Sequence, residues 1–299
     1  NCRISTNPLV EFMEFGKTPL GNGFLDKKDF SSEYFYNMSI GYCQKSKMVQ
    51  LLEQPTPSKM FHDKYAFFTG TSRSMVKHFS QHALDIDAQH LTSHDPFIIE
   101  IGCNDGTFLE YFAKKKIRHL GVEPSQNVAQ IAQEKGIHCI CDFFSTKSAQ
   151  MILESEGKAD VITAANVICH IPDFLDVLQA VAILLKDGGV FIFEEPYLGD
   201  VVQKTSYDQF YDEHVYMFSG MSVSYAAALS GLEIIRFQHL DTHGGSMRYY
   251  LSKKLDRKID ESVMAQIQQE KSLGLDKVET FIKFRKNCEQ SRDKLKQIL

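Results

Sequence analysis

One stretch of the chain, residues 97–112, constrains the fold more than any other. It begins with the apolar run Phe97-Ile-Ile-Glu-Ile101, breaks at Gly102 and Gly106, and resumes with apolar residues at helical spacing. An apolar run without alternation is typical of a strand buried on both faces, so the pattern predicts a strand, a tight loop and a helix. Glycines have no side chain to hold a ligand away from the backbone, and the start of a helix carries free N–H groups. We therefore expect this loop to bind an anionic small molecule.

The residues after this loop point to an adenosyl ligand. The dinucleotide fingerprint G-x-G-x-x-G is absent, because Asn104 stands where its second glycine would be, and this argues against a nicotinamide cofactor. A second predicted strand ends at Glu123, whose carboxylate could accept hydrogen bonds from ribose hydroxyls. A third, over residues 136–141, ends at Asp142, where a contact with the edge of an adenine is expected. The alternatives are an ordinary αβ turn at the glycines and a solvated strand end at Glu123.

The order of these short patterns adds to that interpretation. E-x-G-x-x-x-G from Glu100, E-P-S from Glu123 and C-D-F around Asp142 together resemble the S-adenosylmethionine site of Rossmann-like methyltransferases. The resemblance implies that Glu100, Gly102, Asn104, Gly106, Glu123, Asp142 and Asn166 bind the cofactor.

Composition narrows the class of protein. A chain of 299 residues, of which 43% are hydrophobic, can bury the core of one large domain with an appendage. No apolar run is long enough to cross a bilayer, and no signal pattern opens the chain, so we expect a cytoplasmic protein without a membrane partner. A net charge of −5 without a long basic run argues against nucleic acid as a partner. The seven cysteines suggest reduced thiols and no disulfide framework.

The order of predicted elements indicates an α/β fold. From residue 97 onward strands and helices alternate, which predicts a parallel, doubly wound sheet with ligands at the carboxyl ends of its strands. Polar residues that include Asn166, His170, Glu194 and Glu195 follow the fourth and fifth strands, and residues 232–240 and 247–252 would close the sheet as an antiparallel pair. We expect a small β-rich module, a helical bridge or lid, the methyltransferase-like domain and the start of a further domain, over 1–57, 58–95, 96–255 and 256–299.

Two half-motifs in the N-terminal module have the spacing of a zinc site. Cys2-Arg-Ile-Ser5 and Cys43-Gln-Lys-Ser46 each match one half of C-x-x-C…C-x-x-C, with serine in both second positions. Serine is a poor zinc ligand at neutral pH because its hydroxyl does not ionise as a thiol does. We expect a module that keeps the fold without the metal, the alternative being zinc held by Cys2, Cys43 and borrowed ligands.

The segment Asp208-Gln-Phe-Tyr-Asp-Glu-His-Val-Tyr216 is the candidate for chemistry. A histidine such as His214 can accept a proton at neutral pH, and the adjacent Glu213 could fix its tautomer. Tyr211 could donate a hydrogen bond to a developing oxyanion. The alternatives are a polar surface turn for this segment and an ordinary strand-end histidine for His170.

Several ordered motifs together closely resemble the sugar C-3 methyltransferases, which act on nucleotide-linked 4-keto deoxysugars. The motifs are Cys2-Arg, Met48-Val-Gln-Leu51, the 97–106 stretch, Asn166-Val-Ile-Cys-His-Ile-Pro172, Glu195-Pro-Tyr-Leu-Gly-Asp200, Tyr211-Asp-Glu-His214 and His243-Gly-Gly-Ser-Met-Arg248. The resemblance covers essentially the whole chain. It implies a zinc-binding N-terminal module, a Rossmann-like class I methyltransferase domain and a C-terminal domain that helps to hold the sugar nucleotide.

The same resemblance assigns roles to individual residues. By position, the functional residues of the family fall on Tyr65, His170, Tyr211, Glu213 and His214. His214 would remove the C-3 hydrogen that the neighbouring ketone acidifies, Glu213 would orient the substrate or the base, and the other three would bind the ketone region and stabilise the enolate. His243 and Arg248 would contact substrate hydroxyls or phosphate, or serve as scaffolding of a glycine turn.

Two departures from the family pattern matter. Ser5 and Ser46 replace zinc cysteines, and after residue 255 we expect only the start of the C-terminal domain. The last predicted helix carries Val278, Phe281, Ile282 and Leu295 on an apolar face that no later element covers, so we interpret the chain as a fragment. A small-molecule O- or N-methyltransferase and a non-catalytic S-adenosylmethionine-binding protein are the alternative functions.

Overall fold

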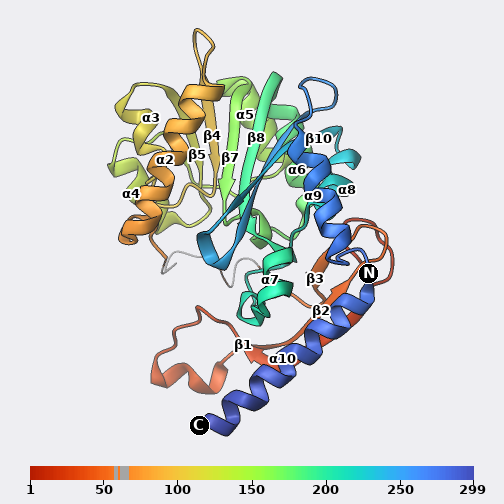
Figure 1. The fold of residues 1–299 in the computed structure, drawn as a ribbon. Helices are drawn as coiled ribbons and strands as arrows, with labels where there is room; N and C mark the ends of the chain where they lie inside the picture. The colour runs from red at the N-terminus through yellow and green to blue at the C-terminus, as the bar shows by residue number, and fades with distance from the viewer. Residues whose placement is uncertain (57–59, 61–66) are drawn as a thin grey trace.

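The computed structural model describes residues 1–56, residue 60 and residues 67–299, and its centre is a seven-stranded sheet (Figure 1). The strand order is β10-β11-β8-β7-β4-β5-β6. Strands β6, β5, β4, β7 and β8 are parallel, whereas β11 pairs antiparallel with both β8 and β10. The strands are β4 (Phe97–Ile101), β5 (Arg118–Val122), β6 (Cys139–Ile140), β7 (Ala159–Ala165), β8 (Leu185–Pro196), β10 (Leu232–Leu240) and β11 (Ser246–Lys253). The predicted doubly wound α/β sheet with an antiparallel end is thus confirmed.

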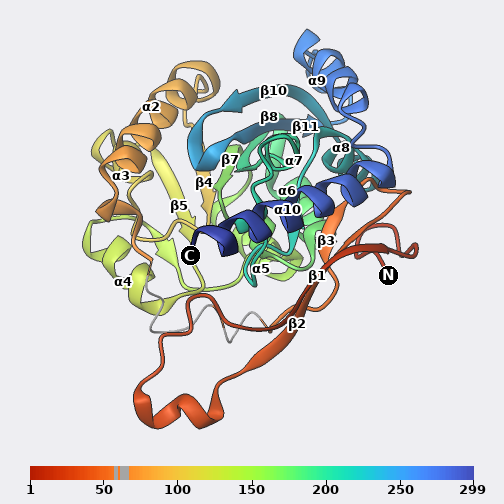
Figure 2. The same ribbon diagram turned by 60° about the horizontal axis from the view of Figure 1, so that its bottom comes forward.

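Helices cover both faces of this sheet (Figures 1 and 2). Because successive side chains of a strand point to opposite faces, Ile98 of β4 packs with α2, α3 and α4, whereas Ile99 packs with α5, α6 and α8. The helices are α2 (Arg73–His90), α3 (Glu110–Lys114), α4 (Gln126–Glu134), α5 (Thr146–Glu156), α6 (Phe174–Leu184), α7 (Leu198–Lys204), α8 (Gly220–Leu229), α9 (Glu261–Ser272) and α10 (Val278–Ile298). None of the helices in the described residues is both long enough and apolar enough to cross a membrane.

Three local predictions were wrong in detail. Strand β8 continues through Glu194 and Glu195, so these carboxylates lie within the strand instead of following it. The third strand is reduced to Cys139–Ile140, and α3 begins only at Glu110 because residues 102–109 form turns.

A second sheet of four strands lies beside the first (Figure 1). Its order is β1-β2-β3-β9, with the strands β1 (Val10–Pro19), β2 (Phe35–Tyr42), β3 (Val49–Leu51) and β9 (Tyr216–Met217). The predicted β-rich N-terminal module therefore takes its last strand from far along the chain, since Gln50 pairs with Tyr216. This pairing anchors the residues just after His214 on the N-terminal sheet.

The long helix α10 packs on that second sheet (Figures 1 and 2). Phe281 is fully buried, with ring centroids 5.2 Å from Phe12 and 4.6 Å from Tyr42. The prediction of an uncovered apolar face is therefore wrong for Phe281, because the N-terminal sheet covers it, whereas Ile282 is 39% exposed. Farther along, Leu295 remains 51% exposed.

Candidate active site

A cavity of about 170 Å³ lies at the carboxyl ends of β4, β5 and β7. It includes the point between β4 and β7 where the order of the strands reverses, which is where ligands bind in open α/β sheets. Of the predicted cofactor and substrate residues, the lining includes Gly102, Asn104, Glu123, Asn166, His170 and His243. The structure thus brings together side chains from four separate loops, whereas Gly106, Glu100 and Asp142 do not line the cavity.

Close packing against neighbouring side chains explains why this loop has glycine at two positions. Gly102 has a φ of +67°, and a Cβ there would lie 2.4 Å from a methyl carbon of Val167. A Cβ on Gly106, with a φ of +74°, would lie 2.7 Å from Ile137. The N–H of Gly102 already donates to the carbonyl of Val122. The N–H of Gly106 likewise donates to the carbonyl of Cys103, so the two glycines use their own donors within the chain.

Asn104 links the glycine loop to the segment that closes one side of the cavity. Its backbone has a φ of +48°, its side-chain nitrogen donates to the carbonyl of Phe67 at 3.1 Å, and its side-chain oxygen accepts from the N–H of Thr69 at 2.9 Å. Both Phe67 and Thr69 line the cavity. Asn104 therefore holds the cavity wall in place through two side-chain hydrogen bonds.

Glu123 is a buried carboxylate at the end of β5. Its two oxygens accept hydrogen bonds from the N–H groups of Asn104 at 3.0 Å and Ser125 at 2.8 Å, and burial raises the pKa of its carboxyl. A carboxylate has about four acceptor positions, so capacity remains for ribose hydroxyls.

The other two predicted acidic contacts lie elsewhere. Asp142 is exposed and accepts the N–H of Phe143, and it is Phe143 and Phe144 that line the cavity. Glu100 is buried in β4, and burial together with nearby anionic groups raises the pKa of its carboxyl well above the usual value. Glu100 therefore lies within the sheet and not on the cavity wall.

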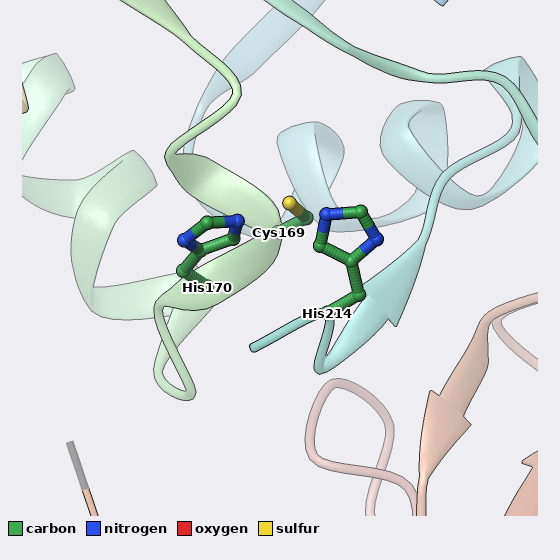
Figure 3. A group of neighbouring side chains, drawn as sticks. All are labelled: Cys169, His170 and His214. Atoms are coloured by element: carbon green, nitrogen blue, oxygen red, sulfur yellow. The ribbon is translucent and has the colours of Figure 1, made fainter. Parts of the chain in front are cut away.

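Two histidines from distant parts of the chain meet beside the cavity (Figure 3). His170 ends the short helix η3 (Ile168–His170), and its ring centroid lies 5.3 Å from that of His214. The Nδ1 of His214 lies 2.8 Å from the carbonyl oxygen of Gln209, and burial lowers the pKa of its imidazole to about 4. Because a carbonyl only accepts, Nδ1 carries the hydrogen and Nε2 keeps its lone pair. His214 is therefore a neutral imidazole that can accept a proton.

Glu213 does not hold this imidazole. Its carboxylate accepts from the Nδ2 of Asn22 at 2.6 Å and lies 3.8 Å from the Nδ1 of His170. The prediction that the adjacent carboxylate fixes the tautomer of His214 is therefore wrong, since the Gln209 carbonyl does so. The ring of Tyr211 lies 4.3 Å from that of His214, and Tyr65 lies outside the described residues.

Three further residues support the histidine pair, and sequence patterns assigned this role to none of them. Asn22 and Gly21 come from the loop between β1 and β2, and Gly21 donates its N–H to Asp212 at 3.0 Å. Glu195 lies fully buried under η3, where its Oε1 accepts from the N–H groups of residues 167, 168 and 169 at 3.0, 2.7 and 3.2 Å. Only Glu195 had a signal, as a polar residue near the end of an apolar strand. The contacts from the N-terminal loop span 191 positions, and nothing local indicates them.

A buried ion pair lies next to the cavity. Arg248 of β11 donates its Nε to Glu194 of β8 at 2.6 Å, and the same carboxylate lies 2.6 Å from the Nε2 of His78 in α2. These partners hold the pKa of the Glu194 carboxyl down at about 2 against the effect of burial. Arg248 is held in this ion pair and does not line the cavity, which favours its alternative role as scaffolding. His243, in contrast, does line the cavity.

The two half-motifs of the N-terminal module do meet in space. The sulfur of Cys2 lies 3.2 Å from the hydroxyl of Ser46, and the hydroxyl of Ser5 lies 3.2 Å from the sulfur of Cys43. Structural zinc sites have four nitrogen or sulfur ligands. Within the described residues, no group of three potential metal ligands includes Cys2 or Cys43. The two thiols and two hydroxyls pair with each other and do not fit a zinc ion.

Comparisons with known proteins find similarity to methyltransferases along the chain. A family model described as a methyltransferase domain matches residues 78–236, a putative zinc binding domain matches residues 2–61, and a C-methyltransferase C-terminal domain matches residues 241–299. The C-methyltransferase NovU of Streptomyces niveus is 26% identical over 302 aligned positions, which cover 100% of this chain and 71% of that protein. A ubiquinone biosynthesis O-methyltransferase of Colwellia psychrerythraea is 32% identical over 126 residues, which cover 40% of this chain and 50% of that protein. Among solved structures, magnesium protoporphyrin IX methyltransferase from Synechocystis with bound SAH aligns with a TM-score of 0.46 and 17% identity, covering 59% of this chain and 82% of that one.

Proposed function

Because the chain belongs to the methyltransferase-domain family and is an S-adenosylmethionine-dependent C-methyltransferase, we propose that it methylates C-3 of a nucleotide-linked 4-keto deoxysugar. The observation that carries this proposal is the buried, neutral imidazole of His214 beside the cavity-lining His170. Forming a carbon nucleophile requires a base, whereas a hydroxyl or amine acceptor needs mainly proximity. The full-length resemblance noted from the sequence supports the sugar as the substrate class.

The cavity residues fit the cofactor. Glu123 would accept hydrogen bonds from the ribose, Phe143 and Phe144 would flank the adenine, and Asn104 and Asn166 would contact the remainder. When bound, S-adenosylmethionine supplies an electrophilic methyl group on a positively charged sulfur, which a carbon nucleophile attacks. Buried carboxylates near the histidine pair, Glu195 and Glu213, would favour a cation in this region.

The residues of the chain would then make the nucleophile. The ketone at C-4 acidifies the C-3 hydrogen, so Nε2 of His214 takes the proton while the electron pair of the C–H bond passes into the enolate. The Gln209 carbonyl, 2.8 Å from Nδ1, would stabilise the resulting imidazolium. The hydroxyl of Tyr211 would donate to the enolate oxygen, and the imidazole of His170 would contact the ketone region of the substrate. Glu213 would orient His170, because its carboxylate faces Nδ1 of that ring at 3.8 Å.

We also propose that the chain is organised as four parts with one shared site, over residues 1–57, 58–95, 96–255 and 256–299. The support is the contact of the β1–β2 loop with the segment that carries His214. Asn22 donates to Glu213 and Gly21 donates to Asp212, so the N-terminal part would position the catalytic segment. The cofactor would bind the third part.

Hydrogen exchange tests the function directly. Candidate 4-ketosugar nucleotides would be incubated in deuterated water with the enzyme, and mass spectrometry would follow deuterium at C-3 and methyl transfer from a labelled donor. We expect exchange and methylation with wild type, both reduced by about 10²- to 10⁴-fold in His214→Ala. His239→Ala is the matched control, since this exposed imidazole pairs with Asp200 away from the cavity.

Two outcomes would contradict the proposal. Methyl found on oxygen or nitrogen without C-3 exchange would support an O- or N-methyltransferase. Cofactor binding without turnover on any 4-ketosugar nucleotide would support a non-catalytic binding protein.

A further inference from the structure

Three potential metal ligands converge at the histidine pair. Cys169, His170 and His214 each offer one ligand atom, and these atoms all lie within 4.8 Å of one another, with the sulfur lying between the two rings in Figure 3. A zinc ion with bonds of about 2.3 Å to sulfur and about 2.0 Å to nitrogen places neighbouring ligands roughly 3.3–3.7 Å apart. Side-chain rotations that move these atoms by about 1 Å would therefore complete three positions of a tetrahedral site.

Two buried carboxylates lie beside this cluster. Glu195 and Glu213 are both buried, and no lysine or arginine in the described parts of the chain forms an ion pair with either. A divalent cation between the three ligands would place a positive charge beside these two buried carboxylates.

The outer contacts of the two imidazoles also suit a metal. A histidine that binds a metal with one ring nitrogen usually donates the other N–H to a carbonyl or carboxylate. The Nδ1 of His214 faces the Gln209 carbonyl at 2.8 Å, and the Nδ1 of His170 faces the Glu213 carboxylate at 3.8 Å. In both rings this arrangement directs Nε2 to the metal.

We propose that zinc binds between Cys169, His170 and His214 and inhibits the enzyme by occupying the nitrogen that acts as the base. On binding, the sulfur–hydrogen bond of Cys169 breaks, its electron pair forms the zinc–sulfur bond, and the proton passes to Glu195 or to water. Metal binding is independent of the proposed function, whereas the inhibition rests on it. Among the described residues of the N-terminal module, the thiols Cys2 and Cys43 are paired with serine hydroxyls and belong to no group of three potential metal ligands.

The test compares two buried thiols on the full chain freed of metal by chelation. Zinc would be titrated into wild type, Cys169→Ser and Cys43→Ser by calorimetry, and each protein's methyl transfer would be measured with and without zinc. We expect one zinc per chain in wild type and in Cys43→Ser, with inhibition of turnover in both. In Cys169→Ser the Kd for zinc should rise at least about tenfold, since even the loss of an outer contact has that effect.

Cobalt provides a second measurement that needs no variant to fold. Bound cobalt should show a thiolate-to-metal absorption band in wild type, and excess zinc should remove it. No stoichiometric binding of either metal, or zinc binding that is lost in Cys43→Ser and kept in Cys169→Ser, would overturn the proposed site. Zinc bound at Cys169 without an effect on turnover would overturn the inhibition and the assignment of His214 as the base, while the metal site would stand. A protein with no methyltransferase activity would still report the site by calorimetry and absorption.

Discussion

The Nδ1 atom of His214 lies 2.8 Å from the carbonyl oxygen of Gln209, a residue of the same short segment. This contact fixes the tautomer of the imidazole from within the segment. The neighbouring carboxylate of Glu213 points away, toward Asn22 and His170. The proposed base is thus positioned by a backbone group, which no side-chain substitution removes directly.

The pH dependence of turnover follows from this environment. Because burial lowers the pKa of His214 to about 4, the imidazole is already neutral well below the pKa of about 6.5 that a free histidine has. We expect kcat/KM to stay level between about pH 8 and pH 6, as His214 does not titrate in this window. Initial rates over this range measure it, and an acidic limb near the ordinary histidine value would contradict the assignment.

The free energy of unfolding should decrease as the pH is lowered, because the pKa of His82 is also depressed by burial. This α2 side chain is buried, neither ring nitrogen forms a hydrogen bond within the described chain, and burial lowers the pKa of its imidazole to about 3. The unfolded chain binds a proton more readily, so this contribution is complete above the unfolded pKa and is lost as the pH falls from there toward 3. We expect it to cost about 2 kcal/mol of unfolding free energy between pH 7 and pH 5.

Urea denaturation at the two pH values measures this difference, with His82→Leu as the comparison. His170 and His214 have lowered pKa values too and act with the same sign, so the variant should lose only part of the pH dependence. An unchanged difference in His82→Leu would show that His82 does not carry the effect.

Asn104 allows the side-chain and backbone contributions to be separated. Asn104→Gly keeps the positive φ without strain but removes the bonds to Phe67 and Thr69, so the cavity wall should loosen and the Kd for S-adenosylmethionine should rise about tenfold, as expected for roughly one hydrogen bond. Asn104→Ala loses the same bonds and adds about 1 kcal/mol of backbone strain. Calorimetry and urea denaturation would measure both effects. Equal stability of the two variants would argue against the strain, and unchanged affinity in both would argue against the role of the wall.

The packing of α10 on the N-terminal sheet gives a prediction for stability. Phe281→Ala should lower the free energy of unfolding by about 3–5 kcal/mol, because it leaves a cavity between Phe12 and Tyr42. Leu295→Ala on the same helix is the matched control and should change it by less than about 0.5 kcal/mol, since this side chain is half exposed. Chemical denaturation distinguishes them, and similar losses in both variants would contradict the packing described.

Sequence patterns predicted the central sheet well and the site only in part. Buried strands such as Phe97–Ile101 and Ala159–Ala165 were found because their apolar runs are a local signal. The two turn glycines were also found, but their reason for being glycine was not, because the atoms that a Cβ would meet belong to Val167 and Ile137. The exposed Asp142 shows the same limit, since strand ends are predicted better than the directions of their side chains.

The sequence by itself determined the α/β alternation, the chemical character of the Tyr-Asp-Glu-His segment and the loss of two thiols from the zinc motif, because each is written in consecutive or regularly spaced residues. Tertiary structure decided which partners these groups have. It brought His170 to His214, seated Asn22 on Glu213, placed Glu195 under η3 and covered α10 with the N-terminal sheet. These contacts join residues far apart in the chain, and their geometry depends on the packing of whole elements, which local pattern does not encode.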